Sequence, residues 1–83
     1  MKELKIIHEK DFYRDFFYYQ SRFPTTHTLL KIVHETLLDE SNAQGGIFGI
    51  QVSSEWEDKC YTFKPVSSTP NEITYEYLGI GKS

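Results

Sequence analysis

Few side chains in this 83-residue chain could act as nucleophiles, bases or metal ligands: it contains three histidines and one cysteine, Cys60. His27 and His34 stand seven residues apart, which is about 10 Å along a helix axis. That separation is too long for the pair alone to hold one metal ion. Spacing alone leaves open a site that combines one of them with Cys60 and a carboxylate. We predict no metal site and no cofactor.

Two short segments match only part of a chemical motif. His34 begins the sequence of a zinc-protease helix, but the second histidine that this motif requires would stand at Leu38. The segment 79–83 ends like a phosphate-binding loop, but the first glycine of that loop would fall on Glu76. No order of nucleophile, base and acid is visible elsewhere. We therefore predict that the chain is not an enzyme and has no catalytic residues.

A run of aromatic residues between positions 12 and 23 is the most distinctive pattern in the chain. At 100° per residue, four of the rings share one stripe that can face a core: Phe12, Phe16, Tyr19 and Phe23. Tyr13 and Phe17 form a second pair on another flank, and Tyr18 lies on a third. One short helix thus carries more aromatic surface than a small core needs. The second flank either packs on another helix or binds a partner, and we assign Tyr13 and Phe17 to a partner-binding surface.

The only tryptophan of the chain lies in an acidic segment at residues 55–58, Glu55-Trp56-Glu57-Asp58. Tryptophan is enriched at the centres of protein interfaces, and the acids around it would favour a basic partner. The alternative is that Trp56 folds over one end of the core while the acids solvate a turn. We include Glu55, Trp56, Glu57 and Asp58 among the predicted partner-binding residues.

Hydrophobic periodicity predicts one small α+β domain over residues 1–83. A period of 3.6 residues indicates helices over 9–22 and 27–39, with a turn-rich linker at 41–46. Alternating apolar residues indicate strands around 48–52, 61–64 and 73–77, and Pro65 should end its strand or lie on an edge. We expect two helices packed on one face of a three-stranded antiparallel meander. The pattern also allows a short N-terminal strand at 4–7.

Charge is divided unequally along the chain. Residues 1–34 carry a net charge of +2, and residues 35–83 carry −5. Lysine and arginine form no cluster of the kind that duplex nucleic acid requires, so nucleic acid is an unlikely partner. No apolar run approaches the ~20 residues of a membrane helix, and a lone cysteine fits a reducing compartment. We expect a cytoplasmic protein without a membrane partner.

These observations favour a small regulatory protein that binds another protein. The version we expect is an inhibitor, or an immunity- or antitoxin-type partner, of a protein with a basic surface. Self-association as a homodimer or larger homo-oligomer would add buried surface to so small a core. The alternative is a module for single-stranded nucleic acid, which would stack bases on outward-facing sheet aromatics. The residues that this alternative requires are Tyr61, Phe63, Tyr75 and Tyr77.

Overall fold

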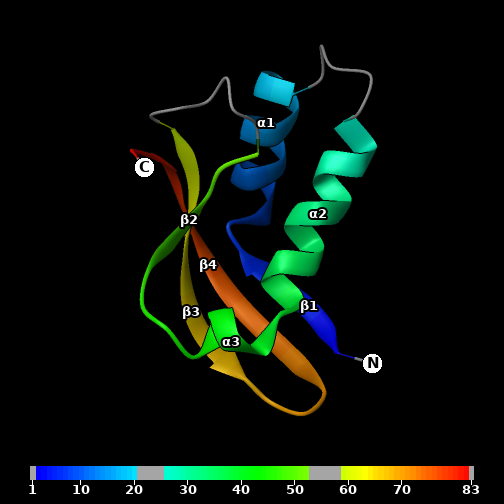
Figure 1. Cartoon of the computed structure of the whole chain (residues 1–83), viewed down its shortest axis with the longest axis vertical. Coiled ribbons are helices and arrows are strands. Elements are labelled where there is room, and N and C mark those ends of the chain that lie inside the picture. Colours follow the sequence, from blue (N-terminus) through cyan, green and yellow to red (C-terminus); the bar gives the residue numbers. More distant parts are fainter. Residues whose placement is uncertain (1, 21–25, 53–58, 83) are drawn as a thin grey trace.

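The computed structural model describes residues 2–20, 26–52 and 59–82, and they form an α+β fold as predicted. Helices lie on one side of a sheet (Figure 1). In chain order the elements are β1 (Glu3–Ile7), α1 (Glu9–Gln20), α2 (Thr26–Leu38), α3 (Glu40–Ala43), β2 (Phe48–Ile50), β3 (Cys60–Ser68) and β4 (Glu72–Gly81).

The sheet has four strands in the order β1-β4-β3-β2. Strands β2, β3 and β4 pair antiparallel in sequence order, which is the meander that the alternation predicts. Strand β1 pairs parallel to β4, from Glu3 opposite Glu72 to Ile7 opposite Glu76. The sheet is therefore mixed, and the purely antiparallel arrangement that we expected describes only part of it. A parallel neighbour needs a long connection, and the helices and strands between β1 and β4 supply it.

The chain turns from β1 into α1 at His8. This residue has a φ of 68°, in the left-handed region that non-glycine residues rarely adopt. Its carbonyl accepts hydrogen bonds from the amides of Asp11 and Phe12 at 3.0 and 3.2 Å, so it satisfies the first turn of α1. The His8 ring also approaches Glu76 on β4, with 3.3 Å between Nε2 and Oε2. His8 thus fixes the direction in which α1 leaves the sheet.

The short helix α3 occupies part of the segment that we expected to be a linker. Asp39 has an extended backbone, and its carboxylate accepts a hydrogen bond from the Ser41 amide at 3.0 Å. An aspartate in this position caps a helix N-terminus, which is why the chain forms one turn here. The bond also lowers the pKa of Asp39.

Two irregularities bend the meander. Pro65 lies inside β3, not at its end, and the pairing with β4 shifts between Pro65 and Ser67. Strand β2 pairs with β3 only at residues 61–63, so β3 has no strand on that side at Pro65 and loses no ladder bond there. The second shift occurs beside Gly79, whose φ of 100° suits glycine.

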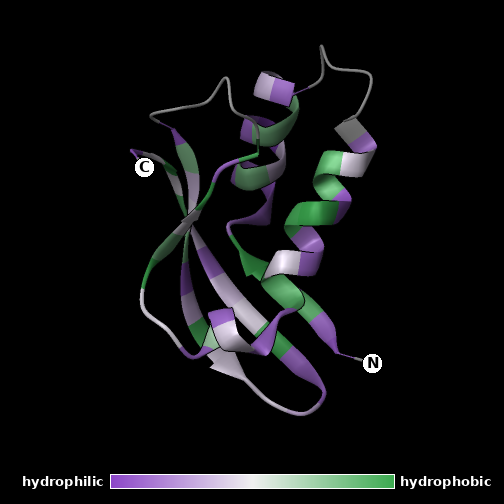
Figure 2. Ribbon diagram, in the orientation of Figure 1, coloured by the Kyte–Doolittle hydropathy of each residue, from purple (hydrophilic) through white to green (hydrophobic). Residues whose placement is uncertain are grey.

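The core lies between the helices and the inner face of the sheet, and Figure 2 shows hydrophobic residues interspersed with hydrophilic ones along the elements that enclose it. Phe12 of α1 is fully buried, with its ring centroid 5.3–5.6 Å from those of Tyr61, Phe63 and Tyr77. The rings of Tyr61, Phe63, Tyr75 and Tyr77 are all buried in this core. The alternative arrangement, in which these rings face outward as a stacking platform, does not occur, because the amphipathic helices need an apolar surface to cover.

Two buried tyrosines of β4 provide a matched test of this packing. The hydroxyl of Tyr75 has no hydrogen-bond partner among the described residues, whereas that of Tyr77 donates to Asp15 at 2.7 Å. We expect Tyr75→Phe to raise the free energy of unfolding by about 1 kcal/mol, because it removes an unsatisfied polar group. Tyr77→Phe should lower it by about 2 kcal/mol, because a bond to a carboxylate is lost. Urea denaturation measures both, and equal destabilisation by the two changes would contradict this account.

Candidate functional site

Two phenols of the sheet fix the position of α1. The Tyr77 hydroxyl donates to Asp15 Oδ2, and Gln20 Nε2 donates to the Tyr61 hydroxyl at 3.2 Å. Burial raises the pKa of Tyr77, and the hydrogen bond to Asp15 raises it further. Burial also raises the pKa of Tyr61, to about 12, although the bond from Gln20 opposes this. Both phenols are therefore protonated at neutral pH, and they hold α1 at two points along its length.

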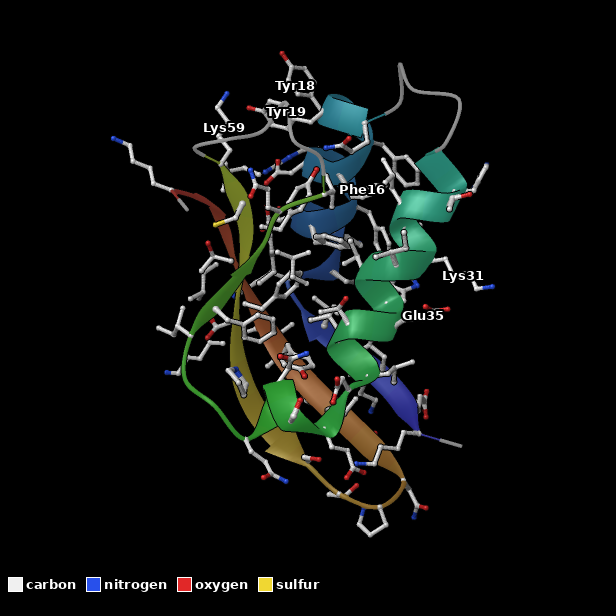
Figure 3. The ribbon with its side chains drawn as sticks, in the orientation of Figure 1. Phe16, Tyr18, Tyr19, Lys31, Glu35 and Lys59 are labelled. Atoms are coloured by element: carbon white, nitrogen blue, oxygen red, sulfur yellow. The ribbon has the colours of Figure 1, made fainter. Side chains whose placement is uncertain are left out.

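Above these anchors, the C-terminal half of α1 leaves aromatic rings exposed. Phe17 is 41% exposed, and Tyr18 is 78% exposed. Tyr18 meets the half-buried Tyr19 nearly edge-on, with 4.9 Å between ring centroids. Lys59 Nζ lies 5.7 Å from the centre of the Tyr19 ring, a cation–π distance. Figure 3 shows Tyr18, Tyr19 and Lys59 together at one end of the molecule.

Tyr13, which we predicted to bind a partner, packs mainly on α2. Its hydroxyl lies 3.1 Å from His34 Nε2, and the two rings are perpendicular at 6.2 Å. Burial lowers the pKa of His34 and raises that of Tyr13, so both groups favour their neutral forms, and the direction of the hydrogen bond between them depends on the imidazole tautomer. Tyr13 also stacks on Phe17 at 6.4 Å. Of the two alternatives for this flank, packing on the second helix describes Tyr13, and partial exposure describes Phe17.

The other predicted partner-binding residues, Glu55, Trp56, Glu57 and Asp58, lie outside the described part of the chain. Phe23 of the expected buried stripe also lies outside it, while Phe12 and Phe16 of that stripe are buried. Sequence reasoning did not assign Tyr18 to the site. The available signal was that Tyr18 belongs to neither aromatic stripe of α1, which left it without a neighbour to cover it.

Charged groups on the exposed side of α1 are paired with one another. Arg14 forms ion pairs with Asp11 at 3.4 Å and with Asp15 at 3.2 Å. Asp15 therefore receives Arg14 on one oxygen and the Tyr77 hydroxyl on the other. The exposed rings therefore stand beside a paired cluster with a net charge of −1, which combines apolar contact area with a weak attraction for a positive group.

Groups that could do catalysis or bind metal are dispersed. Within residues 2–20, 26–52 and 59–82, no cluster of three or more histidine, cysteine, aspartate or glutamate side chains could hold a metal ion. His8 and Glu76 form a surface pair. Cys60 is buried with its sulfur 3.8 Å from the Thr62 hydroxyl, over Gly49, where a Cβ would come within 2.3 Å of that sulfur. Cys60 thus fills the space that Gly49 leaves open.

Comparison of the chain with protein-family models, with curated proteins and with solved structures gave no match. No helix in the described ranges has the length and apolar character required to span a membrane. The interpretation of function therefore depends on the geometry of the exposed rings.

The contact between Tyr13 and His34 makes stability depend on pH. Since burial lowers the folded-state pKa of His34 from 6.5, the unfolded chain binds its proton first as the pH falls. The stabilisation is complete above pH 6.5 and is lost progressively below it. We expect the melting temperature to fall as the pH drops below about 6.5, and His34→Gln to remove part of this fall while its amide can still form a hydrogen bond with Tyr13. Parallel pH curves for the two proteins would contradict the assignment.

Proposed function

We propose that this chain acts by binding another protein through the aromatic surface of α1. This surface consists of the exposed Phe17 and Tyr18 and the half-buried Tyr13 and Tyr19 beside them. The observation that carries the proposal is the exposure of Tyr18, a large ring that is 78% accessible on a helix whose other face is fully packed.

The aromatic surface is suited to binding because α1 holds it rigidly. Phe12 and Phe16 are fully buried, and the bonds from Tyr77 to Asp15 and from Gln20 to Tyr61 lie on the same helix. Rings on a fixed support lose little conformational entropy when a partner covers them. Tyrosine is also enriched among the residues that dominate binding energy at interfaces.

For the partner we propose a protein with a basic surface, and for this chain the role of an inhibitor or another small regulatory protein. The support is the net charge of −5 over residues 35–83, which would attract such a surface while the rings of α1 supply the apolar contact. Glu55, Trp56, Glu57 and Asp58 remain proposed contributors to an acidic rim. A catalytic role has no support from the described side chains, and the burial of the sheet aromatics removes the basis of the nucleic-acid alternative.

Tyr18→Ala tests the proposal directly. The free energy of unfolding should change by no more than about 0.5 kcal/mol, because the ring is exposed. Capture of a partner from a native extract by the immobilised chain should be lost or weakened about tenfold or more, as expected for an interface anchor. The captured protein, identified by mass spectrometry and purified, is then titrated against both chains by calorimetry.

Leu78→Ala is the matched control, since Leu78 is also an exposed apolar residue but belongs to β4 and not to α1. It should capture the same partner as the wild type. Raising the salt concentration should weaken capture if the partner is basic. Equal affinity of the wild type, Tyr18→Ala and Leu78→Ala for the purified partner would overturn the assignment of the site to α1.

A further inference from the structure

Strand β1 has an open edge. It is the last strand on its side of the sheet among the described residues. The amide of Glu3 donates to the carbonyl of Asn71 at 2.9 Å, toward β4. Because successive residues of a strand direct their backbone groups to opposite sides, Leu4 and Ile6 direct their amides and carbonyls away from β4. These two residues therefore present a short ladder of backbone groups at the edge of the sheet.

The surface along β1 is accessible. An open hollow of about 400 Å³ is lined by all five residues of β1 together with Glu9 and Thr74. A second hollow, of about 460 Å³, continues past the end of the strand, where Ile6, His8 and Lys10 are among the residues that line it. An added strand would run along the first hollow. Unpaired edges of this kind are where sheets associate, unless their side chains oppose it.

We propose that a second copy of this chain pairs with β1 as an antiparallel strand, with Leu4 opposite the partner's Leu4. The two sheets would join across a two-fold axis into one continuous sheet. This surface is separate from the aromatic surface of α1, so the proposal is independent of the proposed function.

Charge selects this register from the alternatives. With Leu4 on the axis, Glu3 stands opposite the partner's Lys5 and Lys5 opposite the partner's Glu3, so two opposite-charge pairs form. Glu3 and Lys5 are both exposed on the solvent face of the sheet, where Lys5 also forms an ion pair with Glu72 of β4 at 3.2 Å. With Lys5 on the axis, two lysines would face each other, which is destabilising. Moving the axis to Ile6 would place Leu4 opposite the partner's His8, whose left-handed backbone does not continue the strand.

One apolar side chain, Ile32, is exposed on the flank of α2 that lies on the β1 side, beside the exposed Thr28 and Glu35. His34 faces α1 through Tyr13, and Ile32 stands about 160° away around the helix. α1 packs over β3 and β4, and α2 lies closer to β1, so the side opposite α1 is the side of the open edge. Ile32 is 50% exposed there. Across the two-fold axis it would meet the same flank of the partner's helix, which adds apolar contact to the strand pairing.

Charge reversal tests both the dimer and its register. In Glu3→Lys the facing pairs become lysine against lysine, and in Lys5→Glu they become glutamate against glutamate. Each variant alone should dimerise about tenfold or more weakly than the wild type, because two attractive pairs become repulsive. An equimolar mixture of the two should associate again, because every facing pair is then of opposite charge. Sedimentation equilibrium between about 5 µM and about 500 µM measures all four samples.

Lys64→Glu provides the matched control for Lys5→Glu, because it changes the net charge by the same amount at an exposed position of β3, outside the proposed interface. This variant should dimerise as the wild type does. A wild type that stays monomeric throughout this range overturns the proposal. The proposed register is wrong if Glu3→Lys and Lys5→Glu each dimerise as strongly as the wild type. It is also wrong if their equimolar mixture associates no more strongly than each variant alone. None of these results depends on the capture of another protein.

Discussion

The packing of Phe12 against the sheet is the contact on which the rest of the structure depends. Its ring touches tyrosine and phenylalanine rings of both β3 and β4, so it joins α1 to the two central strands at once. The bond between Tyr77 and Asp15 lies one helical turn further along and sets the rotation of α1 about its own axis. Because the position and rotation of α1 are fixed, its orientation determines which of its rings face the core and which face the solvent.

This constraint divides the aromatic residues of α1 into two groups. Phe12 and Phe16 are buried in the core, and Tyr13 is half-buried beside His34 of α2. Tyr18 points away from both layers, and Phe17 is only partly covered. The exposure of these rings on a helix whose other side is packed is the observation on which the proposed binding surface depends. The edge of β1 is a second exposed feature, because no described strand pairs with its outer side.

Local signals in the sequence predicted most of the elements, but not how they come together. The period of residues 9–22 predicted α1, and the alternation of residues 73–77 predicted the first half of β4, because burial on one face imposes those patterns. The parallel position of β1 depends on contacts between distant residues, so five residues of alternating sequence could not predict it. Pro65 did not end its strand because a missing neighbour makes its position an edge. The exposure of Tyr18 was not predicted, because the prediction considered rings that share a helix face, and Tyr18 shares its face with no other ring.

The central claim is that α1 carries ring surface beyond what the fold can bury, and photochemical nuclear polarisation of tyrosines tests it most directly. In this measurement a dye in solution polarises only the rings that it can reach. The account predicts a strong signal from Tyr18, weaker signals from Tyr13 and Tyr19, and none from Tyr61, Tyr75 and Tyr77, which are buried. A silent Tyr18, or a strong signal from any of the three buried rings, would contradict it.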